Sequence, residues 1–297
     1  MELRTLHYFT VVARELNITR AAEKLNMSQP PLSNQIKALE GELGVQLFIR
    51  SKRHLELTEE GALLLRRAVQ MQELADKTRQ EIASLREGMT GTVYLSMVEG
   101  RAPFLAAQWI AGFREEFPLV RYNLWNGSSD DVLDRLRKGL ADLAVIAAPY
   151  DSEHLEGFPV GREPWAAMLH PDHPLAKEPG DIPLSSLVGE PLIVPSRKSR
   201  VEAIRRWFGE IGAEPQILCE MSNYMDAVAL TSQGVGVSIF PQTVEVSNGL
   251  VVSKAVTRPA RQAEYILVWN KGQAPTGLTR EFIHYVQDCL EERQTKA

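Results

Sequence analysis

The spacing of helix signals in the first forty residues limits the possible folds of this 297-residue chain more than any other feature. Apolar side chains recur at helical spacing through residues 2–16, which predicts an amphipathic helix. A second, short helix follows, with Thr19 as its expected cap and Ala21-Ala22 facing inward, where small side chains permit a close helix crossing. Ser28 is placed to cap a third helix whose first turn holds Pro30-Pro31, because a missing N–H costs least there. These signals predict a small three-helix domain.

The third predicted helix has two faces of opposite character. Its apolar stripe, which we expect to be buried, consists of Leu32, Ile36, Leu39 and Leu43. Its opposite face is short, polar and rich in amides, and consists of Gln29, Pro30, Ser33, Asn34 and Lys37. Such side chains reach base edges in a major groove, and a lysine suits a phosphate. We interpret this face as a DNA-reading surface, because a merely solvated face would more often be rich in Glu and Lys.

A basic hairpin is expected after the third helix. Leu47-Phe48 should anchor its first strand, and Leu55 and Leu57 alternate in the returning strand. The tip between them consists of Arg50, Ser51, Lys52, Arg53 and His54. Cations on such a wing can grip backbone phosphates of DNA.

Many spaced residues of this region together match a known signature. They are Phe9, Ala13, Thr19, Ala21-Ala22, Leu25, Ser28-Gln29-Pro30, Ser33, Gln35-Ile36, Leu39-Glu40, Leu43-Gly44, Leu47-Phe48, Arg50, Leu57-Thr58 and Gly61. In this run the chain resembles the LysR-type transcription regulators. The resemblance implies a sequence-specific regulator that binds double-stranded promoter DNA through a winged helix-turn-helix. The residues expected to contact DNA are Thr19, Ser28, Gln29, Pro30, Ser33, Asn34, Lys37, Arg50, Lys52 and Arg53.

A long helix without proline is predicted from Thr58 to about Glu87, and it carries a heptad stripe. The stripe consists of Leu64, Ala68, Met71, Ala75, Thr78, Ile82 and Leu85. We expect these residues to form a homodimer through a coiled coil, because periodicity and resemblance agree; a homotetramer and contact with RNA polymerase are further expectations. The alternative is that the stripe packs on its own domain.

The remaining two thirds of the chain alternate strand and helix patterns, which predicts parallel β-α-β units. The predicted strands are 92–98, 121–126, 142–148, 165–169, 191–194, 216–220, 235–239 and 265–269, and the predicted helices are 102–117, 129–139, 199–211, 223–233 and 276–292. This order resembles the LysR effector domain, which is similar to periplasmic solute-binding proteins.

The expected fold is therefore an α+β winged helix-turn-helix, a long dimerisation helix, and an α/β two-lobed, periplasmic-binding-protein-like effector domain. The expected domains are 1–58 for DNA binding, 59–89 for the linker helix and 90–297 for the effector domain. Lobe I should combine 90–161 with 266–297, and lobe II should hold 162–265.

Ligands of such sheets bind at the carboxyl ends of strands, where helix N-termini offer unpaired N–H groups. The residues expected to bind an effector at these ends are Gly100, Arg101, Ser128, Ser196, Arg197 and Asn223. Hydroxyls, helix amides and the cations Arg197 and Lys198 would suit a small anion, in particular a carboxylate. The alternative is that the serines only cap helices and the cations are solvated.

Other features exclude several protein classes. Residues 1–89 hold 13 Lys and Arg against 12 Asp and Glu, a net charge of +1, so the remainder carries −6 of the total of −5 and the negative charge lies away from the DNA reader. The absence of an apolar signal segment predicts a cytoplasmic protein without membrane contact. His170 and His173 have no evident third ligand, so we expect no metal and no cofactor. No catalytic signature is legible, so we expect no enzyme; the main alternative function is a solute-binding protein of the periplasmic-binding fold.

Overall fold

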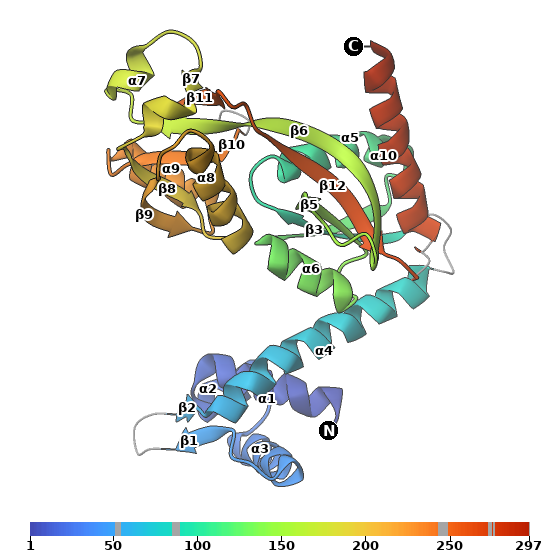
Figure 1. Cartoon of the computed structure of the whole chain (residues 1–297). Helices are drawn as coiled ribbons and strands as arrows, with labels where there is room; N and C mark the ends of the chain where they lie inside the picture. The colour runs from blue at the N-terminus through green and yellow to red at the C-terminus, as the bar shows by residue number, and fades with distance from the viewer. Residues whose placement is uncertain (51–54, 85–89, 243–248, 273–274, 276, 297) are drawn as a thin grey trace. The chain divides into compact units, whose positions relative to one another are not determined.

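The computed structural model describes residues 1–50, 55–84, 90–242, 249–272, 275 and 277–296. The chain divides into two compact units, Met1–Gly88 and Met89–Ala297, which Figure 1 shows with their element labels. Each unit is a separate body with its own apolar core. No helix among the described residues is long and apolar enough to cross a membrane.

Three helices form the core of unit 1: α1 (Leu3–Glu15), α2 (Ile18–Lys24) and α3 (Gln29–Leu43). Asn17 caps α2, because its side-chain oxygen accepts a hydrogen bond from the Arg20 backbone N–H at 3.1 Å. The expectation that Thr19 is the cap was wrong, since α2 begins at Ile18 and Thr19 lies exposed within its first turn. The buried side chains include Leu6, Phe9, Val12, Ala21, Ala22, Leu32, Ile36 and Leu39.

The apolar stripe of α3 is shorter than expected. Leu32, Ile36 and Leu39 are buried, but Leu43 is 39% exposed. The helix ends at Leu43 because Gly44 takes the left-handed conformation that commonly terminates helices. Leu43 therefore lies beyond the region that α1 and α2 cover.

The wing begins from a contact with α3. Strands β1 (Phe48–Arg50) and β2 (Leu55–Leu57) pair antiparallel, with Phe48 opposite Leu57. The Glu40 carboxylate on α3 accepts hydrogen bonds from the backbone N–H groups of Leu47 and Phe48, at 2.9 and 3.3 Å. This contact fixes where the hairpin leaves α3.

Helix α4 (Glu59–Ser84) follows the wing directly. The Thr58 hydroxyl donates to the Gln46 carbonyl at 2.8 Å and accepts from the Gly61 N–H at 2.9 Å, so it both caps α4 and ties it to the wing. A Cβ at Gly61 would lie 2.2 Å from the Leu47 carbonyl oxygen. Only glycine permits this close approach of α4 to the wing.

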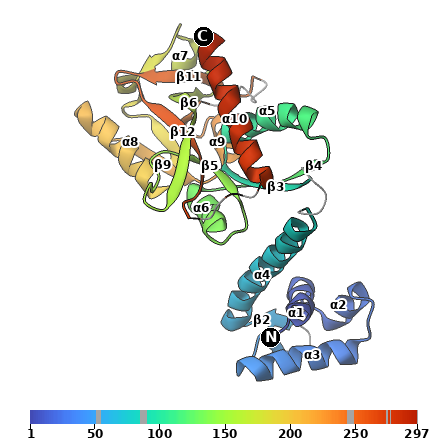
Figure 2. The same cartoon turned by 90° about the vertical axis from the view of Figure 1, so that its right-hand side faces the viewer.

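The first sheet of unit 2 has the strand order β4-β3-β5-β12-β6, in which β6 is Leu155–Leu169 and β12 is Gln262–Asn270. Its parallel strands are β3 (Gly91–Val98), β4 (Val120–Gly127) and β5 (Leu143–Ala147), and its helices are α5 (Ala102–Glu116), α6 (Ser129–Arg137) and α10 (Gly277–Lys296). Helices α5 and α10 pack together, with the Phe113 and Phe282 ring centroids 5.1 Å apart. Figures 1 and 2 show α6 on the opposite face of this sheet. The alternation of strands and helices predicted this layering.

The second sheet repeats the parallel arrangement. It contains β8 (Pro191–Pro195), β9 (Gln216–Met221) and β10 (Val237–Pro241), with helices α8 (Lys198–Glu210) and α9 (Tyr224–Ser232). Four small elements were not predicted: α7 (Pro174–Lys177), β7 (Ile182–Pro183), a 3-10 helix (Leu184–Leu187) and β11 (Val252–Thr257). The first three have at most four residues, which are too few to show a periodicity. Strand β11 has six residues, and its pattern was not recognised.

Two long strands connect the sheets. The N-terminal part of β6 (Leu155–Leu169) pairs with β12 (Gln262–Asn270), and its C-terminal part pairs with β10 and β11. Figure 1 shows both strands running from one lobe to the other. We expected strands only at 165–169 and 265–269, and both are longer. Proline and glycine in 155–164 obscure the strand pattern of β6, and β12 begins three residues earlier than expected.

Candidate functional site

The polar face predicted on α3 is present and open to solvent. Gln29, Pro30, Asn34 and Lys37 are exposed, and Ser33 is half-buried. Ile36 and Leu32 on the opposite face are fully buried, so packing fixes the rotation of the helix. The face therefore presents short hydrogen-bonding side chains on a rigid support.

The N-terminus of α3 has no side-chain cap. Ser28 holds the cap position, and Pro30-Pro31 lies in the first turn as expected. The Ser28 side chain makes no cap hydrogen bond, which corrects the expectation that it would satisfy the helix. The first turn of α3 also contains no acidic residue. The exposed Ser28 hydroxyl and the positive end of the helix dipole remain available to a phosphate.

The wing residues that we expect to contact phosphates lie at or beyond the limit of the described residues. Arg50 ends β1, and its side chain is not described. Lys52 and Arg53 lie outside the described residues. Their role in DNA binding remains a prediction from the sequence.

The heptad stripe of α4 divides into two parts. Leu64, Ala68 and Met71 pack against the core of unit 1, and Ala68 is fully buried. The Gln72 amide also donates to the Thr10 hydroxyl of α1 at 3.0 Å. The interpretation of one continuous dimer stripe was therefore wrong for this part, because the alternative, packing on its own domain, applies there.

The C-terminal part of α4 is more open. Ala75 is half-buried, Thr78 is exposed and Ile82 is 59% exposed, while Leu85 lies outside the described residues. Leu74, which the heptad pattern missed, is 43% exposed. Leu74, Thr78 and Ile82 are four residues apart in turn and so share one face of the helix.

Unit 2 contains a cavity of about 420 Å³ at the ends of strands from both sheets. Four of the six predicted effector residues line it: Gly100, Ser128, Ser196 and Arg197. Sequence reasoning missed Glu99, Trp165, Arg200, Tyr224, Phe240 and Tyr265, which also line it. Adjacency to predicted strand ends could have indicated Glu99, Arg200 and Tyr224, because Glu99 follows β3 and the other two lie in the first turns of α8 and α9. Trp165 and Tyr265 gave no such signal, because they lie on the crossover strands β6 and β12.

The two remaining predicted residues, Arg101 and Asn223, hold elements next to the cavity in place. The Arg101 Nε lies 3.0 Å from a Glu163 carboxylate oxygen of β6. Burial raises the pKa of Glu163, and the Arg101 charge opposes that rise. Asn223 caps α9, since its side-chain oxygen accepts from the Met225 N–H at 2.7 Å. Neither residue lines the cavity itself.

Two helix N-termini at the cavity are satisfied by this chain's own side chains. The Ser128 hydroxyl accepts from the Asp131 N–H at 3.2 Å and donates to the Asp131 carboxylate at 2.6 Å, so Ser128 caps α6 as expected. At α9 the Glu99 carboxylate accepts from the Asn223 amide at 3.3 Å and from the Tyr224 N–H at 3.1 Å.

The N-terminus of α8 differs from these two. Arg197 holds its cap position without a side-chain cap bond, and its first turn contains no acidic residue. Ser196 beside it is exposed and lines the cavity. This end of α8 therefore retains free donors and a positive dipole toward the cavity.

The charge at this wall is positive. The Arg200 guanidinium donates to the Ala148 carbonyl at 2.9 Å, lies 5.6 Å from the centroid of the Trp165 ring, and has no carboxylate partner among the described residues. Burial lowers the pKa of Arg200, and nearby Arg197 lowers it further. The Arg197 guanidinium lies 3.8 Å from a carboxylate oxygen of the exposed Asp130. An anion beside Arg200 would offset the cost of burying that charge.

Aromatic side chains form the uncharged part of the lining. They are Trp165, Tyr224, Phe240 and Tyr265. Burial raises the pKa of Tyr265 to about 12, and the Arg101 backbone N–H bonded to its oxygen opposes that rise. Tyr265 therefore stays a neutral phenol at physiological pH. The cavity can hold a small molecule with an apolar body and an anionic group.

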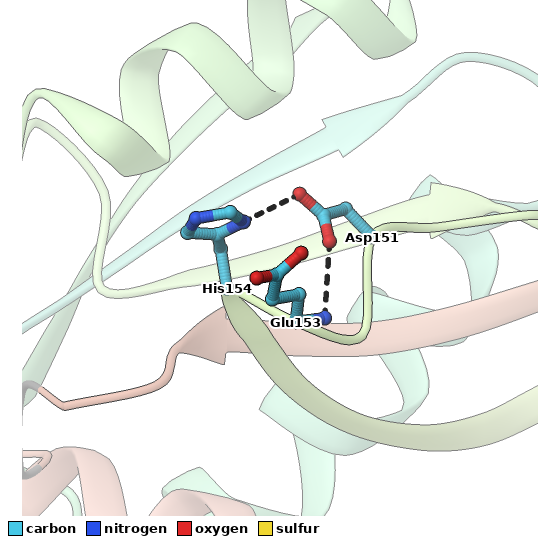
Figure 3. A group of neighbouring side chains, drawn as sticks. All are labelled: Asp151, Glu153 and His154. Atoms are coloured by element: carbon cyan, nitrogen blue, oxygen red, sulfur yellow. Dashed lines mark hydrogen bonds and ion pairs between the residues drawn. The ribbon is translucent and has the colours of Figure 1, made fainter.

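One group of possible metal ligands lies away from the cavity. Asp151, Glu153 and His154 sit on an exposed loop before β6 (Figure 3), with ligand atoms within 4.8 Å of one another. His154 Nδ1 lies 2.7 Å from Asp151 Oδ2, and this hydrogen bond lowers the pKa of Asp151. The contact is a local loop bond. His173, the earlier metal candidate, accepts from the Leu175 N–H and caps α7.

Comparison with known proteins gives two family matches that together span most of the chain. Residues 3–62 match the family described as bacterial regulatory helix-turn-helix protein, lysR family. Residues 86–290 match the LysR substrate binding domain. The first covers α1 to the start of α4, and the second contains the whole cavity lining.

Individual relatives agree with these matches. The Hca operon transcriptional activator HcaR of Escherichia coli (strain K12) is 30% identical over 301 residues, which cover 98% of this chain and 98% of that protein. The crystal structure of full-length CbnR complexed with its target DNA has a TM-score of 0.79 at 24% identity, covering 97% of this chain and 99% of that one. The effector binding domain of QuiR in complex with shikimate has a TM-score of 0.63 at 19% identity, covering 68% of this chain and 98% of that one.

Proposed function

This chain belongs to the LysR family of transcriptional regulators, and we propose that a small anion bound in the cavity of unit 2 controls how its helix-turn-helix unit engages promoter DNA. The family and the homologues are regulators, not enzymes. A solute-binding protein, the main alternative, would not need the DNA-binding unit that residues 3–62 supply. What the family leaves open is the chemistry of the effector.

The free N-terminus of α8 carries this proposal. It combines unpaired helix donors, the exposed Ser196 hydroxyl and the half-buried Arg200, whereas the helices α6 and α9 at the same cavity already have caps. A carboxylate is the group that such a set binds best, because helix amides, a hydroxyl and a guanidinium all donate to its oxygens. QuiR was solved with shikimate, which is a carboxylate.

The proposal is tested with a panel of small carboxylates and their uncharged amides. A carboxylate that binds should raise the melting temperature of the wild-type protein, and its amide should not. The double variant Ser196→Ala/Arg200→Gln should lose this stabilisation. Arg205→Gln removes an exposed cation further along α8 and should keep it. Equal stabilisation by carboxylates and amides would contradict an anionic effector.

The same panel tests the link to DNA. An effector shifts a conformational equilibrium only through its different affinity for the two states, so the bound carboxylate must change operator affinity or the size of the protected DNA segment. The Ser196→Ala/Arg200→Gln variant should bind the operator like wild type without effector and fail to respond to it. Footprinting with and without the carboxylate measures both properties.

We also propose that the open part of α4 pairs with a second copy of the chain. Leu74 and Ile82 expose apolar surface on one helix face, and their burial in a dimer would remove that surface from water. Leu74→Glu/Ile82→Glu should separate protomers, because the dimer would bury unpaired charges. Arg66→Glu, on an exposed position of the same helix, is the control. Sedimentation at wild-type mass for the double variant would contradict this interface.

A further inference from the structure

The cavity contains a carboxylate of the chain itself, at a position that a ligand carboxylate could occupy. Glu99 follows β3, and its two oxygens accept from the Asn223 side chain and the Tyr224 backbone N–H. Both partners lie at the start of α9, more than a hundred residues later in the chain. The geometry is that of an anion bound at a helix N-terminus, with the anion tethered to the other lobe.

We infer that Glu99 is an internal ligand of α9, which holds the two lobes together without effector and leaves the cavity one external anion position, at α8. The second half of this inference rests on the proposed function; the first half does not. Glu99 determines specificity because a second anionic group near α9 would meet its negative charge and find the helix donors already used.

Two further observations support an asymmetric cavity. The α6 end carries Asp130 and Asp131 in its first turn, so it also disfavours an anion. Arg200, at the α8 end, is half-buried and has no carboxylate partner among the described residues. Carboxylates of the protein thus lie at the starts of α6 and α9, and the Arg200 guanidinium lies at the start of α8.

Glu99 also differs from an ordinary surface contact in what it joins. Its bond to Tyr224 connects the end of β3 in the first sheet to a helix of the second sheet. Arg200 makes a comparable bond in the opposite direction, from α8 to the Ala148 carbonyl after β5. Removal of Glu99 should therefore loosen the start of α9 and weaken the contact between the two lobes.

The test uses the full-length protein without effector, in buffer free of carboxylates. Hydrogen exchange of the Tyr224 amide reports the bond directly, because that N–H donates to Glu99. Glu99→Ala should speed its exchange about tenfold, since hydrogen bonds to charged groups are stronger than average. Glu99→Gln, which keeps an acceptor oxygen, should show a smaller increase.

Two controls make the result specific. Asp226→Asn removes an exposed carboxylate from the same first turn of α9 and should leave Tyr224 exchange close to wild type. Sodium acetate should restore protection in Glu99→Ala, and acetamide with sodium chloride at matched ionic strength should not. Wild-type exchange in Glu99→Ala, an equal effect of Asp226→Asn, or the lack of restoration by acetate would overturn the inference.

The specificity half has its own readout. In the panel of carboxylates, wild type should prefer benzoate over its dianionic counterpart terephthalate, and Glu99→Gln should reduce that preference. An unchanged ratio of the two affinities in Glu99→Gln would overturn the specificity role. Failure of every carboxylate to bind wild type would overturn the external anion position and the proposed effector class, whereas the exchange result stands independently.

Discussion

The polar face of α3 and the cavity of unit 2 differ in how the fold assembles them. The α3 face comes from ten consecutive residues, 28–37, on one helix whose rotation is fixed by three buried side chains. The cavity draws its lining from residues 98 to 265, on strands and helices of both sheets. A local pattern is enough to position the first, while the second depends on the topology of the whole unit.

The two regions also differ in how their helix N-termini are used. The start of α3 has no side-chain cap bond, and neither does the start of α8. The helices α6 and α9 are capped by Ser128 and Asn223. The starts of α3 and α8 thus lack a side-chain cap at the two places where we expect an outside partner with negative charge, DNA phosphate in one case and an effector in the other. The starts of α1 and α5 also lack a side-chain cap bond, so this property alone does not mark a binding site.

The largest expected effect separates folding from recognition within α3. Ile36→Ala should destabilise unit 1 by about 2–5 kcal/mol, because it removes fully buried apolar volume and leaves a cavity. Chemical denaturation followed by far-UV circular dichroism measures this loss. Asn34→Ala, on the exposed face, is the matched control and should change stability little. Similar losses for both variants would remove the distinction between the two faces.

A second prediction uses pH to probe the cavity wall. Burial raises the pKa of Tyr265 from its ordinary value of 10.0 to about 12. Between these values the unfolded chain loses the phenol proton and the folded protein keeps it, so stability falls as pH rises. The fall attributable to Tyr265 should be about 2–3 kcal/mol.

Denaturation of wild type and Tyr265→Phe across this alkaline range checks the prediction. The variant should lose less stability with rising pH than wild type, because Phe carries no titrating group. Other tyrosines titrate equally in both proteins and cancel in the comparison. Parallel pH profiles would show that Tyr265 does not stay buried and neutral at the cavity.

A third prediction tests base readout by α3. Gln29→Ala should reduce discrimination between operator and unrelated DNA by about 1–3 kcal/mol, as expected for loss of one good base contact. Lys37→Ala should instead weaken binding to all sequences and reduce the salt slope by about 1, as expected for a phosphate contact. Competition binding at several salt concentrations distinguishes a loss of sequence discrimination from a general loss of DNA affinity. Unchanged operator preference in Gln29→Ala would contradict the assignment.

The contrast between the two regions explains what could be predicted from the sequence. The helices of unit 1 and the β-α-β order of unit 2 follow periodicities that are visible in short windows. Strand ends in those windows also located Gly100, Ser128, Ser196 and Arg197, all of which line the cavity.

What the sequence did not predict depends on tertiary contacts. Asn17 and Thr19 are both acceptable caps, and only the packing of Ile18 decides between them. Ala68 fits a dimer stripe and a domain core equally well by periodicity, and its burial against unit 1 decides for the core. Glu99, Arg200 and Tyr265 acquire their roles from residues about fifty to more than a hundred positions away.

The central claim is that the free N-terminus of α8 binds the effector anion. The most direct measurement is the amide chemical shift of Lys198 and Ser199, the first residues of α8, on titration with the carboxylate that stabilises the wild-type protein most. Both resonances should shift with the same dissociation constant that calorimetry gives, and the uncharged amide of that ligand should leave them in place. Saturating carboxylate that moves neither resonance, or that moves the amides of α6 or α9 instead, would contradict the account.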